Sequence, residues 1–330
     1  IFLQQIGINA NVIDPRKIKI YGNGGRMAPL ANNIPYPFDL TENAIQVAGE
    51  SDGFFNDNDY VIFYAEGVDN WSDENQTTNN LYSDKSYYYI NVQGADGKRI
   101  QPMAQPTGTG TAITAFDDIQ YHELDLVNIA RLGRRWFGEE FDVTNEQQFA
   151  FNIPNILTAE PANVFVYAGA VAPASTNFKV DVNNQLAGNM TLAAIGNETQ
   201  ATFSTVSAVV PASENMTVKL TYTNNGVPNS KGYLDYISIK SKRSLKGYGK
   251  QFRFQYDLSA SSIGIGEYQL TSAANINQVW DITDIFEVTK AENTGQANFA
   301  FKANFGELRK YIAVDLGDLY VPLFEAQTRV

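Results

Sequence analysis

Cysteine is absent from this 330-residue chain, and histidine occurs only once. Without a thiol, the chain can form no disulfide, no thiolate metal site and no cysteine nucleophile. A single histidine, His122, argues strongly against a Ser-His-Asp triad and against a multi-histidine zinc centre. The residue types therefore point away from the common forms of nucleophilic and zinc catalysis.

Long apolar runs and charged residues are also scarce. No apolar run approaches the ~20 residues that a membrane helix needs, so we predict no membrane span. Charged residues make up only 18% of the chain, and Asn, Thr, Ser, Gly and Tyr are frequent in their place. This mixture favours antiparallel sheets with many turns over charged amphipathic helices.

Basic residues are missing from one long stretch. None occurs between Arg26 and Lys85, whereas residues 39–84 contain eleven of the acids behind the net charge of −12. We expect this stretch to form one anionic surface. Such a surface repels phosphate backbones, so we predict that nucleic acid is not a partner. A divalent cation or a basic protein surface would be attracted instead.

Short strand patterns recur along most of the chain, often at intervals of about ten residues. The predicted fold class is mainly β, with antiparallel β domains that include a jelly-roll-like β-sandwich and with a few short helices. We predict three domains, which are an acidic β domain over 1–115, the sandwich over 116–245, and a further β region over 246–330. The apolar spacing in 121–133 predicts a helix that leads the sandwich, and QPMAQPTGTGTAIT at 101–114 predicts a flexible linker.

The candidate metal site is the turn DGFFNDND, in which Asp52, Asp57 and Asp59 could bind Ca²⁺ through their carboxylate oxygens. The spacing of an EF-hand is not met, and an acidic hairpin turn explains the same residues. No other cofactor is predicted, and no catalytic residue is assigned.

Other polar motifs each have an ordinary structural explanation. GNGG at 22–25 lacks the lysine and hydroxyl residue of a phosphate-binding loop. The acid pairs Asp117–Asp118 and Glu139–Glu140 would point to opposite faces of a strand, which is poor geometry for shared catalysis. The basic residues between Lys240 and Arg253 are either a solvated strand end or a docking surface for an acidic domain or anionic partner.

Several strings, spread in order over nearly the whole chain, resemble the PorU family, the sortases of the Bacteroidetes type IX secretion system. The strings are IKIYGNGGRMAP, ENAIQVAGESDGFFNDNDYVIFYAEG, YSDKSYYYINV, GKRI, FDDIQYHELDLVNIARLGRRWFGEEF, GYLDYISIKSKRSL, WDITDIFEV and LRKYIAVD. In that family, N-terminal β domains precede a gingipain-type cysteine peptidase domain. No residue here matches the family's catalytic Cys and His, so the resemblance implies a non-catalytic front region leading toward a peptidase domain.

The resemblance also implies a cellular setting. A PorU-type sortase is a cell-surface enzyme associated with the outer membrane, which removes the C-terminal signal of cargo proteins and attaches them to anionic lipopolysaccharide. Its expected partners are the secreted cargo and PorV, an outer-membrane β-barrel. Two rival hypotheses are a carbohydrate-binding module, with Trp71 and Trp136 exposed on one face, and a structural β-sandwich of a secreted surface protein.

Overall fold

The computed structural model describes residues 2–72, 74–129, 131, 133–197 and 199–325. Strands account for 42% of the chain and helices for 5%, which confirms the mainly β fold class. The chain divides into two compact units, and neither unit is one continuous segment. Unit 1 comprises Ile1–Val68, Ser83–Thr114 and Leu245–Val330, and unit 2 comprises Asp69–Tyr82 and Ala115–Ser244.

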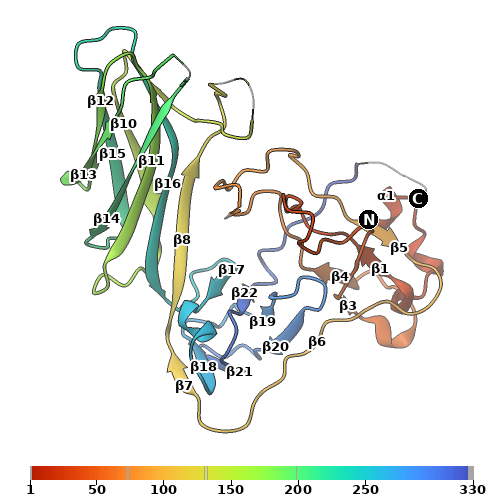
Figure 1. Ribbon diagram of the computed structural model, residues 1–330. Coiled ribbons are helices and arrows are strands. Elements are labelled where there is room, and N and C mark those ends of the chain that lie inside the picture. The colour runs from red at the N-terminus through yellow and green to blue at the C-terminus, as the bar shows by residue number, and fades with distance from the viewer. Residues whose placement is uncertain (1, 73, 130, 132, 198, 326–330) are drawn as a thin grey trace. The chain divides into compact units, whose positions relative to one another are not determined.

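Unit 2 is a β-sandwich of two antiparallel sheets, with strand orders β10-β15-β12-β13 and β14-β11-β16-β8 (Figure 1). Short β9 pairs with β16 beside the second sheet. The strands are β8 Ala115–Glu123, β9 Glu140–Phe141, β10 Glu146–Asn152, β11 Ala162–Val171, β12 Thr176–Val182, β13 Gln185–Leu192, β14 Thr202–Val210, β15 Asn215–Thr223 and β16 Lys231–Ser244.

The strand pairing of unit 2 is that of a jelly roll. β12 pairs with β13, β11 with β14, β10 with β15 and β8 with β16, so along the sequence each pair encloses the pair named before it. Alternate residues of each strand point inward, and side chains such as Val164, Phe178 and Leu220 from the two sheets share one buried core. The predicted jelly-roll-like sandwich is therefore confirmed.

Unit 1 contains several small sheets, with orders β2-β1-β5, β3-β4, β21-β18-β7 and β17-β22-β19-β20-β6. Its strands are β1 Lys19–Tyr21, β2 Glu42–Asn43, β3 Ile45–Ala48, β4 Tyr60–Phe63, β5 Tyr89–Asn91, β6 Gln101–Pro102, β7 Thr111–Ile113, β17 Phe252–Gln255, β18 Ile265–Leu270, β19 Gln278–Asp281, β20 Thr289–Glu292, β21 Phe299–Asn304 and β22 Lys310–Val314. Its short helices are α1 Phe2–Gln5, η1 Ala10–Val12, η2 Pro15–Lys17, η3 Glu50–Asp52 and η4 Asp257–Ala260.

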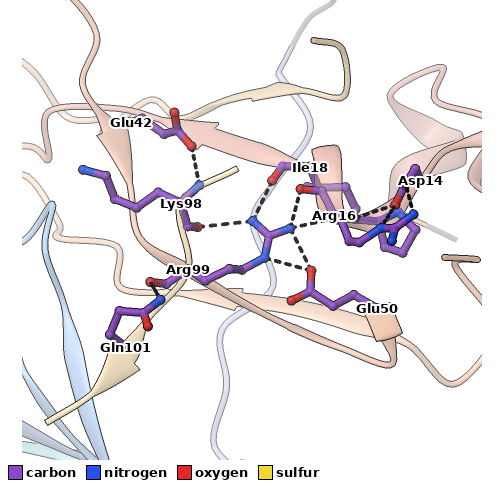
Figure 2. A network of polar contacts seen from close by, with 9 residues as sticks. Asp14, Arg16, Ile18, Glu42, Glu50, Lys98, Arg99 and Gln101 are labelled. Carbon is purple, nitrogen blue, oxygen red and sulfur yellow. Dashed lines mark hydrogen bonds and ion pairs between the residues drawn. The ribbon is translucent and has the colours of Figure 1, made fainter. Parts of the chain in front are cut away.

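One guanidinium connects segments of unit 1 that are far apart in the sequence (Figure 2). Arg99 donates to Glu50 Oε2 at 2.8 Å, to the carbonyl of Arg16 at 2.8 Å and to that of Ile18 at 3.1 Å. A half-buried guanidinium whose donors are satisfied in this way fixes the chain just before β1 against η3. The strings IKIY and GKRI, both cited for the family resemblance, meet at this network.

The predicted linker and leading helix are both wrong. Within 101–114, β6 pairs with β20 and β7 with β18, and Met103 and Ile113 are buried. Both ends of this segment are therefore held within unit 1, and the stretch 104–110 between them has no strand. Within 121–133, the described residues contain no helix. Residues up to Glu123 extend β8, because the 14-residue β16 provides a backbone partner for each of them.

The chain passes from unit 1 to unit 2 twice, for the short segment Asp69–Tyr82 and for the long segment Ala115–Ser244, and returns to unit 1 after each. The first and last segments of the sequence contribute to one compact unit. Ala44 and Ile62 share a buried cluster with Trp280 and Val314. The division into three domains stays a prediction.

Candidate functional site

The candidate site lies on the face of the β14-β11-β16-β8 sheet that points away from the sandwich core. A small recess of about 10 Å³ opens there, on the order of the space for one water molecule. Its walls come from the segment 75–81, the end of β8, the segment 134–136 and β16. The lining residues are Asn75, Gln76, Thr77, Leu81, Glu123, Asp125, Arg134, Arg135, Trp136 and Asp235.

A buried ion pair is at the centre of this site. Asp235 projects from β16 and is only 3% exposed, and its carboxylate accepts a hydrogen bond from Arg135 Nη1. The Arg135 guanidinium carbon also lies 4.7 Å from the centre of the Tyr167 ring on β11. A guanidinium over an aromatic face gains a cation–π attraction in addition to its ion pair. Arg135 is thus held by two neighbouring strands at once.

The electrostatics of the recess are dominated by acids. Burial raises the pKa of Asp235 to about 7, Arg135 opposes this shift, and Glu123 and Asp125 add to it. Burial, followed by the nearby Glu123, also raises the pKa of Asp125. At neutral pH, Asp235 can therefore gain or lose a proton, whereas an exposed aspartate would stay ionised.

Polar contacts and ring stacking attach the segment 69–82 to this face. The backbone N–H and the hydroxyl of Thr78 both donate to Glu123 Oε2, each at 2.6 Å. Arg134 Nη1 donates to the side-chain oxygen of Asn75. The Trp71 ring stacks on Tyr121, with centres 5.0 Å apart and planes 11° apart. These contacts attach the segment 69–82 to the outer face of the sheet beside the recess.

The chain's one histidine does not reach this recess. His122 follows Tyr121 on β8 and so points to the other face of the sheet, where its ring packs 4.6 Å from that of Phe149. Its Nε2 lies 2.7 Å from Glu139 Oε1. The recess therefore has one buried acid, Asp235, two partly buried acids, Glu123 and Asp125, and two guanidinium groups. This arrangement suits the structural attachment of the segment 69–82 to the sheet and a change in protonation at Asp235.

The predicted calcium residues form a hydrogen-bonded turn. Asp52 accepts from the backbone N–H of Phe54 and from the Asn56 amide, each at 3.0 Å. Asp59 accepts from the backbone N–H of Asn56 at 2.7 Å. Within the described residues, no three His, Cys, Asp or Glu side chains form a group suited to hold a metal ion. Calcium binding at Asp52, Asp57 and Asp59 stays a prediction.

The structure separates the acid pairs that the sequence placed side by side. Asp117 pairs with Lys242 at 2.6 Å, whereas Asp118 pairs with Arg243 at 3.3 Å. His122 contacts Glu139, and Lys231 lies 2.6 Å from Glu140. Each acid in a pair thus has its own partner, as expected for alternating sides of a strand.

The acidic stretch and the basic run are less uniform than predicted. Glu66 is buried and forms an ion pair with Arg26, and Glu50 pairs with Arg99. Residues 69–82 belong to unit 2, whereas the other acids of the stretch belong to unit 1. In the basic run, Arg243 is 5% exposed and donates to the Pro154 carbonyl, so it supports the fold. Glu50 and Glu66 are thus neutralised by arginines from outside the stretch, and one anionic surface stays a prediction.

Sequence reasoning missed the ion pair between Arg135 and Asp235. The string RRWFGEEF at 134–141 is a cluster of charged and aromatic residues. Asp235 is a charged residue within the mainly apolar strand pattern of Tyr233–Ile239. A lone acid in an otherwise apolar strand was the available signal. Nothing in the sequence connects it to an arginine one hundred positions away, because only the strand order brings the two together.

The fold class follows from the sheets of the structure, because sequence comparisons give no match. No protein-family model matches the chain, and no curated protein matches it by sequence. The architecture is that of a mainly β protein built of several antiparallel sheets, one pair of which forms a jelly roll. No helix in the described part of the chain is long and apolar enough to cross a bilayer.

A solved structure with the same fold is that of dimeric latent PorU from Porphyromonas gingivalis. It aligns with a TM-score of 0.73 over 92% of this chain at 18% sequence identity, and this chain spans 30% of that protein's length. The chain therefore has a PorU-like fold. Carbohydrate-binding modules are also similar in part, namely CBM36 in complex with calcium and xylotriose and CBM35 from Cellvibrio japonicus. Their TM-scores are 0.25 and 0.21, over 38% and 40% of the chain, and these values are too low to support an argument.

Proposed function

We propose that this chain is the N-terminal, non-catalytic β region of a cell-surface sortase of the type IX secretion system. The observation that carries the proposal is the PorU-like fold over 92% of the chain. The strings that resemble the PorU family occur in the family's order and support the same assignment, because sequence strings and fold are separate observations.

In this proposal, the chemistry belongs to a cysteine peptidase domain outside the chain. That domain cleaves the C-terminal signal of cargo proteins and attaches them to anionic lipopolysaccharide. The absence of cysteine from the chain is consistent with this division of labour. The β region positions the peptidase and contacts partners, which are the secreted cargo and the outer-membrane β-barrel PorV. Its location is the cell surface, at the outer membrane of a Bacteroidetes-type bacterium.

The first test concerns the gene. If the reading frame that encodes this chain also encodes a cysteine peptidase domain after residue 330, the sortase assignment gains direct support. If the frame contains no such domain, the assignment fails.

The second test concerns the activity. The codons for this region are deleted in the bacterium that encodes it, and mass spectrometry follows the C-terminal signal on secreted cargo. We expect the signal to be retained, as in a control strain in which the peptidase cysteine is replaced by alanine. Normal removal of the signal in the deletion strain, with the truncated protein present, would show that the region is dispensable.

A carbohydrate-binding module remains the alternative hypothesis. It draws on the aromatic rings of the recess face, but one side of the Trp71 ring is covered by Tyr121, and Trp136 is 38% exposed. The recess itself has room for about one water molecule and not for a sugar ring. Binding of the purified chain to a glycan array, abolished by Trp136→Ala, would favour this alternative over the sortase region.

A further inference from the structure

One wall of the recess is a surface segment, residues 74–82, which we call the strap. All of these residues are described by the structure, and Thr77 alone among them is buried, with 6% of it exposed. A surface segment that buries so little can open locally while the sandwich core stays folded. The strap lines the recess with Asn75, Gln76, Thr77 and Leu81.

Polar bonds to charged groups outside the strap hold it closed. The backbone N–H and the hydroxyl of Thr78 both donate to Glu123 Oε2, each at 2.6 Å. The Asn79 side chain donates to the carboxyl group of Asp125. In these bonds the strap supplies neutral donors and its neighbours supply carboxylates, which are stronger acceptors when they are ionised. The attachment of the strap therefore depends on the charge of the recess.

The closed strap also keeps water away from two carboxyl groups. Asp235 is 3% exposed and Asp125 is partly buried, and the recess has room for about one water molecule. Burial is the largest cause of the raised pKa of both groups, which is about 7 for Asp235. Opening the strap hydrates both groups and returns their pKa toward the ordinary aspartate value. The closed strap therefore holds more protons than the open strap, so a rise in pH favours opening.

Charge repulsion in the recess works in the same direction. When all three acids are ionised, Glu123, Asp125 and Asp235 face only the two guanidinium groups of Arg134 and Arg135 among the residues that line the recess. Protonation of Asp235 removes the excess negative charge. Like charges that are held in a buried site favour the neutral form of one of them.

The other titratable groups near the recess do not change this balance. Burial raises the pKa of Tyr167 on β11, and it raises the pKa of Tyr236 on β16 to about 12, so both phenols stay neutral below pH 8. Asp69, which accepts a hydrogen bond from the backbone N–H of Asn80 at 3.1 Å, adds to the negative potential at Asp125.

We propose that residues 74–82 are a proton-linked strap, which closes over the recess when its carboxyl groups take up protons and opens as pH rises. The bonds from Thr78 to Glu123 set how firmly the strap closes, and Asp235 sets how closure changes with pH. Opening exposes the ion pair between Arg135 and Asp235 while both sheets of the sandwich stay folded. The strap makes these contacts within unit 2, so its opening does not depend on whether the chain belongs to a sortase.

Hydrogen exchange of the full chain, followed by mass spectrometry between pH 5 and pH 7, tests the strap. Each exchange rate is divided by the intrinsic rate at the same pH, because chemical exchange itself accelerates with pH. If the pKa of Asp235 falls from about 7 to 3.8 on opening, linkage permits roughly a fifty-fold increase in opening over this interval. We expect the protection of residues 74–82 to fall at least about tenfold. At each pH the strap amides should exchange at least about a hundredfold faster than those of β12 in the core.

Three variants assign the effect to particular side chains. Asp235→Asn keeps the shape of the carboxyl group but cannot ionise, so strap protection should lose most of its pH dependence. Thr78→Val removes the hydroxyl donor, so the strap should open more at every pH and keep its pH dependence. The matched control, Asp181→Asn, replaces another buried acid of the sandwich, which pairs with Lys179, and should leave the pH dependence of the strap unchanged.

A wild-type strap whose protection does not change between pH 5 and pH 7 would overturn the proposal. So would a pH dependence that survives in Asp235→Asn. Strap amides that are as strongly protected as those of β12 would also overturn it, since the strap would then open only when the whole sandwich unfolds. Circular dichroism at each pH shows that the variants are folded. If Asp235→Asn does not fold, Asp125→Asn tests the same linkage and should reduce the pH dependence by a smaller amount.

Discussion

At the scale of single residues, the most consequential pair is Asp235 with Arg135. A carboxylate that is 3% exposed is costly to ionise, and the guanidinium beside it reduces that cost. Tyr167 holds the guanidinium from a neighbouring strand. The pair therefore makes the stability of unit 2 depend both on a single arginine and on pH.

Removing the arginine should weaken unit 2. In Arg135→Ala, Asp235 stays buried without its partner, so we expect a loss of about 1–3 kcal/mol, below the full value for a buried pair because the Arg135 side chain is 35% exposed. Urea unfolding at pH 8 measures the loss. The control Lys219→Ala removes a more loosely packed pair with Glu146 and should change stability by less than about 0.5 kcal/mol. Equal losses in the two variants would contradict the central role of Arg135.

The pH dependence has a definite sign. Because the pKa of Asp235 is about 7 in the folded chain and 3.8 in a free side chain, the folded state holds the extra proton between these values. This group should therefore make the chain less stable as pH rises from about 4 to about 7, and should add no further slope above that. Asp235→Asn should remove this part of the slope. Parallel stability curves for wild type and variant across this window would refute the assignment.

At the scale of elements, strand predictions succeeded where alternation was regular and failed where an apolar stripe had helical spacing. The stripe that predicted a helix began with Leu124, which is 40% exposed, and Val127 and Ile129 are only partly buried, so these side chains do not form one buried face. Val127 instead pairs with Phe137, exchanging backbone hydrogen bonds of 2.8 Å in both directions. Periodicity records which side chains are apolar, but the neighbouring strand decides whether the backbone bonds locally or across a sheet.

The close packing of the sandwich can be tested at a glycine. A Cβ on Gly232 would lie 2.6 Å from Cζ of Phe178 and 2.7 Å from Cδ2 of Tyr222, and both rings are buried. Gly232→Ala should therefore destabilise the chain by about 1–3 kcal/mol in thermal or urea unfolding. In the control Gly196→Ala, the added Cβ meets no atom within 4 Å, so little change is expected. A neutral effect at Gly232 would mean that the two rings can move apart freely.

A melting experiment tests whether the turn at Asp52–Asp59 binds Ca²⁺ or is held by its own hydrogen bonds alone. The carboxylates of Asp52 and Asp59 already accept bonds from within the turn, so we expect neither added Ca²⁺ nor a chelator to change the melting temperature. A ligand that binds only the folded state must raise its stability. A rise in melting temperature with Ca²⁺ that is lost in Asp57→Asn would instead establish a calcium site.

At the scale of the whole molecule, the order of segments along the chain differs from their grouping in space. Unit 1 takes residues from both ends of the sequence, and unit 2 includes the separate segment 69–82. The sequence, taken in order, shows where composition changes. It cannot show that strands some two hundred residues apart complete one core, as β4 and β19 do through Ile62 and Trp280.

The net charge gives a prediction for the whole chain. With a net charge of −12, the protein should show no binding to duplex DNA or single-stranded RNA in fluorescence anisotropy at low salt, where phosphate attraction is strongest. A basic DNA-binding protein is the positive control. Measurable binding that weakens steeply with salt would reveal a basic surface that the charge count conceals.

The sequence by itself determined the mainly β fold, the jelly-roll-like sandwich and the absence of cysteine chemistry, because alternation, turn residues and composition are local properties. Only the tertiary structure decided that Arg135 reaches Asp235, that residues 115–123 are strand, and that part of the acidic stretch is neutralised. Each of these depends on which strands become neighbours. Strand order is set by long-range packing that no short window of sequence contains.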